Sequence, residues 1–100
     1  MIRHIVMWKI KKDIPPFEKQ QLMLTFKHNM NNLNEMVSGI KKLEVIINEL
    51  DSSNMDMMLI SEFETKAVLV EYQQHPKHKA ASKCLVNMID TRSCIDYEYK

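Results

Sequence analysis

The 100-residue sequence predicts an α+β fold with a four-stranded antiparallel sheet in a single domain, residues 1–100. Four segments alternate apolar and polar residues with the period of two that a β-strand requires. Two other segments repeat apolar residues every three or four positions, which is the period of an amphipathic helix. The segments follow one another in the order β-α-β-β-α-β, and a chain of this length supplies one hydrophobic core.

The first expected strand is IRHIVMWKIK, residues 2–11. Apolar residues occupy its even positions and also, at Ile5 and Met7, its other face, so we expect both faces to be covered. A Pro-Pro pair ends the strand and favours the first turn of a helix. That helix shows an apolar stripe at positions 22, 26, 30, 33 and 37, and the only glycine, Gly39, marks its end.

The middle of the chain predicts two further strands. KLEVIINEL, residues 42–50, and MDMMLISEF, residues 55–63, both alternate apolar side chains between two faces. The polar segment DSSN between them is typical of a turn.

A second helix is expected from Thr65, whose hydroxyl suits an N-cap, to Pro76, which disfavours helical geometry at the residue before it. We expect the helix to resume, with Met88 and Ile89 continuing its apolar stripe. The last strand is TRSCIDYEY, residues 91–99, with Ile95, Tyr97 and Tyr99 on one face.

This element order is the ferredoxin-like βαββαβ pattern, whose right-handed crossovers place both helices on one face of the sheet. The other face then carries apolar residues that nothing in the chain covers, and such a face usually marks an interface. We therefore expect a homodimer in which two copies press their sheet faces together.

Composition excludes several function classes. Lys and Arg number 14 and Asp and Glu number 13, so the net charge of +1 argues against a nucleic-acid binder. No apolar run is long enough for a membrane span, and the N-terminal segment lacks a secretory layout, so we expect a cytoplasmic protein with no membrane partner.

Neither the cysteines nor the methionines predict a specific site. Cys84 and Cys94 match no zinc or redox spacing and are expected to be buried or half-buried apolar residues. Met55, Met57 and Met58 line an adaptable pocket in one interpretation and fill the core in the other.

The most informative motif is YQQHPKH, residues 72–78. In a functional interpretation, Tyr72 and His78 face a ligand from either side of the Pro76 break. In a structural one, His75 caps the helix junction and the other two are partly buried residues with satisfied polar groups. His75 and His78 are not expected to bind a metal, because the sequence offers no third ligand at a usable spacing. His28 is expected at the surface.

Three segments together resemble the stress-responsive A/B-barrel (Dabb) domain family: the opening IRHIVMWKIK, the YQQHPKH motif and the closing RSCIDYEY. The resemblance covers the whole chain and implies pairing into a dimeric α/β barrel. Other family members resemble plant polyketide cyclases, in which a Tyr and a His of this motif promote an aldol closure. It thus implies Tyr72, His78 and the strand histidine His4 as candidate catalytic residues. The further histidine of the cyclases has no counterpart, since MDMMLIS offers only methionines.

On these grounds we expect a small homodimer that binds a small apolar or carbonyl-bearing molecule in a pocket between helices and sheet, with no cofactor and no metal. One alternative is a cofactor-free cyclase-like or isomerase enzyme, with His78 as general base and Tyr72 as proton donor. Another is a structural dimer without a ligand. His4 is then a buried core histidine rather than part of a pocket. No residue specifically indicates a monooxygenase or a heme-handling protein.

Overall fold

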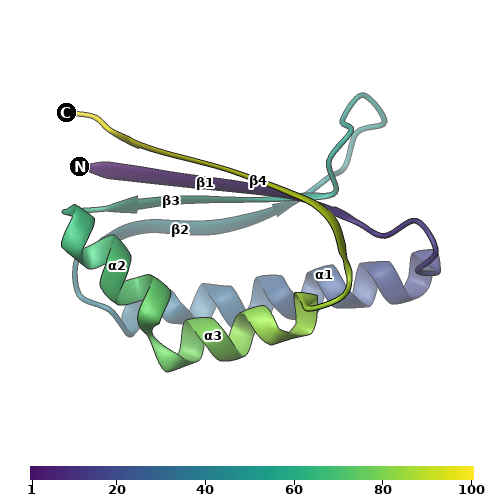
Figure 1. Ribbon diagram of the computed structural model, residues 1–100, viewed down its shortest axis with the longest axis horizontal. Coiled ribbons are helices and arrows are strands. Elements are labelled where there is room, and N and C mark those ends of the chain that lie inside the picture. The colour runs from purple at the N-terminus through teal and green to yellow at the C-terminus, as the bar shows by residue number, and fades with distance from the viewer.

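The computed structural model describes all 100 residues in two layers, a sheet and the helices that cover one face of it (Figure 1). The main elements are β1 (Ile2–Ile10), α1 (Pro16–Asn31), β2 (Ile40–Ile47), β3 (Met57–Phe63), α2 (Lys66–Gln74), α3 (Pro76–Ser82) and β4 (Ile89–Glu98). The strand order is β2-β3-β1-β4, and every neighbouring pair is antiparallel. The α+β class and the ferredoxin-like arrangement predicted from the sequence are confirmed.

The core lies between the two layers. Alternate residues of the central strands β1 and β3 point toward the helices and are buried, while their neighbours on the other face are only half-buried. The indole of Trp8 on β1 meets the ring of Phe26 on α1 edge to face, with centroids 5.1 Å apart. Such a contact fixes the helix against the sheet by geometry as well as by area.

The first helix ends earlier than its apolar stripe suggests. The α-helical part stops at Asn31, and a 3-10 turn, η1 (Asn32–Glu35), leads toward β2. Gly39, the residue before β2, has φ +96°, and a Cβ there would lie 2.9 Å from a methyl carbon of Val68 on α2. Glycine is therefore required both by the backbone and by the close approach of α2.

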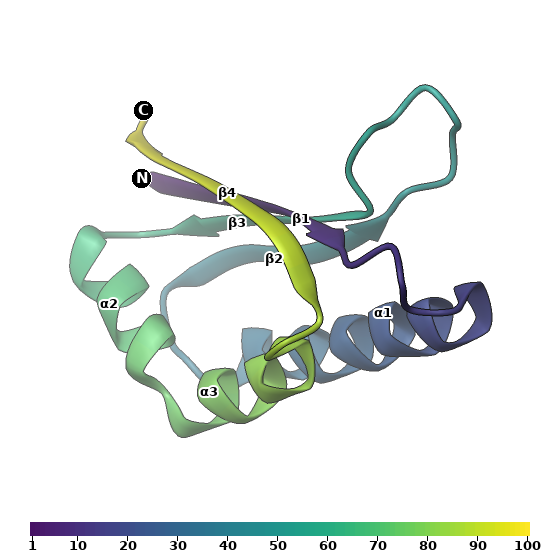
Figure 2. The same ribbon diagram turned by 45° about the vertical axis from the view of Figure 1, so that its right-hand side comes forward.

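The helical segment around the histidine motif differs in one respect from the prediction. Thr65 caps α2 by accepting a hydrogen bond from the Val68 amide at 3.2 Å, as expected. The expected helix through Met88 and Ile89 is wrong, because α3 passes into a short 3-10 turn, η2 (Lys83–Leu85). Val86 leaves the helical region with ψ 129°, Asn87 follows with φ +67°, and β4 already begins at Ile89. Figure 2 shows this return from η2 along the edge of the sheet.

The face of the sheet opposite the helices is uncovered within one chain (Figure 1). Its side chains include Ile5 and Met7 on β1, which pair in register with Ile60 and Met58 on β3. Across β1, Ile95 of β4 stands opposite Ile5 and is 57% exposed. The strands therefore carry apolar residues on both faces, as the sequence predicted, and those on the face opposite the helices point away from the core. None of the helices combines the length and apolarity needed to cross a membrane.

Candidate functional site

The site begins at the junction of α2 and α3, where His75 is both the C-cap of α2 and the N-cap of α3. Its backbone is extended, with ψ 133°, as Pro76 requires of the residue before it. Its Nδ1 accepts a hydrogen bond from the Lys77 amide at 3.1 Å. The predicted capping role of His75 is confirmed.

This junction brings Tyr72 and His78 together. Their ring centroids lie 4.6 Å apart with an edge-to-face inclination of 63°. In an unbroken helix, six residues turn the chain by about 600°, which leaves the two side chains roughly 120° out of line. The break at Pro76 removes this mismatch. The ring of Tyr72 is fully buried, and its other neighbour is Phe63 on β3, at 5.1 Å.

Both residues hold a buried polar atom that has no hydrogen-bond partner. These atoms are the hydroxyl oxygen of Tyr72 and Nδ1 of His78. The structural interpretation of the motif required the polar groups of these two residues to be satisfied by nearby backbone. It is wrong for the Tyr72 hydroxyl, whereas the backbone of Gln73 does interact with the imidazole of His78. A buried polar group without a partner costs about 1–3 kcal/mol, so a pair of them at one place calls for an explanation.

Burial also shifts the protonation of the pair. It raises the pKa of Tyr72 well above the usual tyrosine value, so the hydroxyl keeps its proton. It lowers the pKa of His78, an effect partly opposed by the backbone of Gln73 and reinforced by the nearby charges of His4, Arg92 and His75. His78 is therefore a neutral imidazole at neutral pH, with one nitrogen able to accept a proton.

A cavity of about 310 Å³ lies between the helical layer and the sheet and reaches β4. Its lining consists of His4, Val6, Trp8, Phe26, Met30, Leu59, His78, Ser82, Leu85, Val86, Ile89 and Arg92. This volume is at the lower end of the range for small-molecule pockets, and the mostly apolar wall with a few polar groups is typical of them. His4 and His78 both belong to the wall. Tyr72 does not, because its ring lies behind His78 against Phe63.

His4 is held in place from two sides. It is 3% exposed, its Nδ1 donates a hydrogen bond to the carboxylate of Asp96 on β4, and its backbone oxygen accepts one from the Ser61 hydroxyl at 2.8 Å. The two interpretations of His4, core residue and pocket residue, therefore both describe it. It is buried and hydrogen-bonded, and it also lines the cavity.

Sequence reasoning missed the contribution of β4. Arg92, Cys94 and Asp96 occupy alternate positions of this strand and hence the helix-facing side, and Arg92 lines the cavity while Asp96 binds His4. The period of two contained this signal, but pairing with β1 was needed to connect it to His4. The expected burial of Cys94 is wrong, since it is exposed on an edge strand, whereas Cys84 is half-buried as expected.

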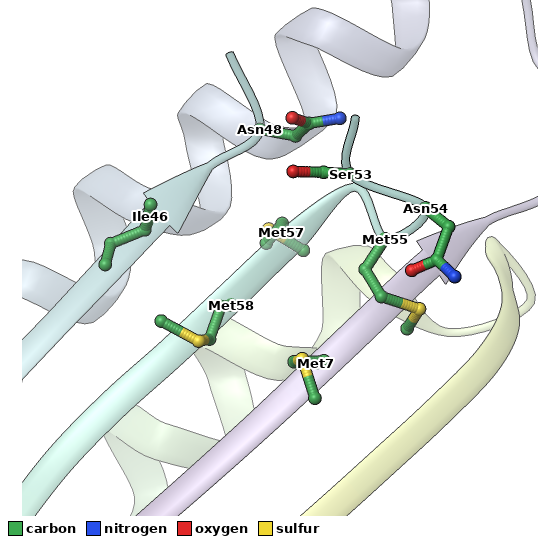
Figure 3. Close-up of a pocket in the computed structure, with 8 residues that line it drawn as sticks. All are labelled: Met7, Ile46, Asn48, Ser53, Asn54, Met55, Met57 and Met58. Carbon is green, nitrogen blue, oxygen red and sulfur yellow. The ribbon is translucent and has the colours of Figure 1, made fainter. Parts of the chain in front are cut away.

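A second hollow, of about 290 Å³, lies on the uncovered sheet face near the β2–β3 loop. Figure 3 shows Met7 and Met58 on the strands and Met55 in the loop around it. Met57 also borders it, although this residue is 2% exposed and belongs to the core. Both interpretations of the methionines are therefore partly correct: Met55 and Met58 line the hollow, whereas Met57 belongs to the core and also borders the hollow.

The fold and the position of the histidine-lined cavity define a ferredoxin-like α+β subunit of the kind found in dimeric α/β barrels. Residues 2–99 match the Stress responsive A/B Barrel Domain family, Dabb, and the chain belongs to this family. Among curated proteins, none matches the chain.

Solved structures support the same fold. A dimeric ferredoxin-like protein of unknown function from Bacteroides fragilis is 36% identical, with 98% of this chain and 95% of that chain covered and a TM-score of 0.93. A Dabb family protein from Mesorhizobium loti is 21% identical, with 99% and 96% covered and a TM-score of 0.74. A hydroxynitrile lyase from Passiflora edulis is 14% identical, with 99% and 93% covered and a TM-score of 0.72.

Proposed function

We propose that this Dabb protein is a homodimer that binds a small apolar or carbonyl-bearing molecule in the cavity between helices and sheet. The observation that carries the proposal is the pair of buried polar atoms without a hydrogen-bond partner on His78, which lines that cavity, and on Tyr72, whose ring packs against His78. A ligand with one polar atom gives His78 the partner it lacks, while the apolar wall accommodates the remainder of the molecule.

The dimer is supported by the uncovered sheet face and by the relative from Bacteroides fragilis, which is dimeric. A large apolar surface left in water is unfavourable, and a two-fold axis lets one face cover its own copy. The methionine-lined hollow of Figure 3 lies on this face, so the partner subunit covers or completes it.

The ligand proposal is tested by ligand-observed NMR with a panel of small ketones and phenols. We expect saturable binding to the unmodified protein, and at least about ten-fold weaker binding to His78→Gln, equivalent to about 1.4 kcal/mol. His28→Gln is the matched control because His28 is exposed on α1, away from the cavity. Equal binding to both variants, or no saturable binding to any panel member, would overturn the proposal.

An enzymatic role is the second candidate, favoured by the lowered pKa of His78. A neutral imidazole accepts a proton from carbon beside a carbonyl, and the protonated Tyr72 hydroxyl next to it is a hydrogen-bond donor for an enolate oxygen. Since Tyr72 lies behind His78, its hydroxyl must come to the cavity for this step. Deuterium exchange at the α-carbon of bound ketones, lost in His78→Gln and retained in His28→Gln, is the expected result. Binding without exchange would contradict this enzymatic role and leave the binding proposal in place.

A further inference from the structure

Three side chains of different chemistry meet on the helix-facing side of the β1–β4 pair. They are His4 from β1 and Cys94 and Asp96 from β4, and Nδ1, Sγ and a carboxylate oxygen all lie within 4.8 Å of one another. The strand register produces this meeting, because His4 stands opposite Asp96 and its neighbour Val6 stands opposite Cys94. Cys94 and Asp96, two residues apart, share one face of β4.

The spacing of these atoms suits a tetrahedral metal ion. The Cys94 sulfur is 3.7 Å from Nδ1 of His4 and 3.6 Å from the Asp96 carboxylate. With the usual zinc bond lengths, the ligand atoms of a tetrahedral site are about 3.4–3.6 Å apart. The remaining pair, His4 and Asp96, is now closed by a hydrogen bond and must separate to admit an ion. Asp96 is free to do so, because its side chain is 43% exposed on an edge strand.

We propose that His4, Cys94 and Asp96 form a three-ligand site for a divalent ion of the zinc class. A set of one nitrogen, one sulfur and one oxygen donor is typical of zinc, whereas magnesium and calcium prefer oxygen alone. When the ion binds, the Cys94 thiol and Nδ1 of His4 give up their protons, and Nε2 then carries the one proton of the His4 ring. Three protein ligands leave the fourth tetrahedral position for water, which is the arrangement of an open rather than a purely structural site.

The proposed metal site does not depend on the proposed ligand pocket. Its ligand atoms need no organic molecule, and Cys94 and Asp96 do not line the cavity. His4 is the one shared residue. It lines the cavity with its ring and presents Nδ1 to β4, so an ion there lies at the margin of the cavity.

The test is a cobalt titration of the full-length protein after chelation, under reducing and oxygen-free conditions. Cobalt(II) replaces zinc in tetrahedral sites, and a bound thiolate gives a charge-transfer band in the near ultraviolet. We expect one ion per chain, a thiolate band, and loss of the band when zinc is added. Cys94→Ser abolishes the band and Cys84→Ser, which changes the other cysteine, retains it.

A second pair of variants covers the carboxylate. Asp96→Ala weakens cobalt binding at least about ten-fold, since even outer-shell changes at metal sites cost that much. Asp90→Ala, at an exposed position of the same strand, leaves binding unchanged. The proposal is overturned by absence of a thiolate band at one equivalent of cobalt, by a band that survives Cys94→Ser, or by equal affinity of the two aspartate variants. None of these results bears on organic ligand binding at His78.

Discussion

The rings of Tyr72 and His78 pack edge to face across a helix break, with their centroids 4.6 Å apart, although six residues separate them. The helix break at Pro76 allows this contact, and Nδ1 of His75 accepts a hydrogen bond from the Lys77 amide at the break. The contact leaves two buried polar atoms without partners, one on each residue. Apolar residues of the same shape would pack equally well, so we infer that these polar atoms serve to bind a ligand.

Replacing Tyr72 by Phe removes a buried hydroxyl that has no partner while keeping the ring. We expect Tyr72→Phe to raise the free energy of unfolding by about 1 kcal/mol, measured by urea denaturation at equal protein concentration. Tyr97→Phe is the comparison, because the Tyr97 hydroxyl accepts a hydrogen bond from Arg3 at 2.5 Å and its loss brings no gain. A clear loss of stability in Tyr72→Phe would mean that the hydroxyl has a partner.

The lowered pKa of His78 predicts a pH dependence of stability. The unfolded chain takes up the His78 proton near the ordinary value of about 6.5, whereas the folded chain takes it up only at lower pH. Stability from this residue is therefore full above pH 6.5 and falls as the pH drops toward the folded pKa. Urea midpoints at about pH 7.5 and about pH 5 should differ less in His78→Gln than in the unmodified protein. His28→Gln should behave as the unmodified protein does. An identical pH response in both variants would contradict the shift.

The uncovered sheet face predicts a charge-sensitive dimer. Ile5→Lys places an unpaired charge in the centre of the proposed interface, where its desolvation costs several kcal/mol. Light scattering should give twice the chain mass for the unmodified protein and a monomer or aggregate for Ile5→Lys. Leu24→Lys should remain dimeric, because Leu24 lies on α1 and is 45% exposed. A well-folded dimer of Ile5→Lys would show that the subunits meet elsewhere.

Most of the fold could be predicted from the sequence because the signals are local. Alternation along β1 and β3, the Thr65 cap and the break at Pro76 each depend on neighbours in the chain. The end of α3 could not be predicted, because Met88 and Ile89 fit a helical stripe and a strand equally well. The non-helical backbone of Val86 and Asn87, with ψ 129° and φ +67°, decides between them, and nothing in the spacing of apolar residues indicates it.

The candidate site was only half visible in the sequence. The motif brought Tyr72 and His78 to attention, but the closing of the helix break decides that their rings touch. The link between His4 and Asp96 depends on the register of two strands at opposite ends of the chain. Pairing of residues 92 positions apart has no signal in a single sequence.

The central claim, that the histidine-lined cavity holds a small molecule, is tested most directly by native mass spectrometry. The protein is purified gently from its own host, together with Val86→Trp and Val70→Trp. Val86 lines the cavity and is 61% exposed, so we expect a tryptophan there to take up space that the ligand needs, whereas Val70 is 42% exposed on α2 and does not line the cavity. The account predicts a dimer carrying a small molecule in the unmodified protein and in Val70→Trp, and an empty dimer in Val86→Trp. An unmodified dimer that carries nothing, or a ligand retained equally by Val86→Trp, would contradict it.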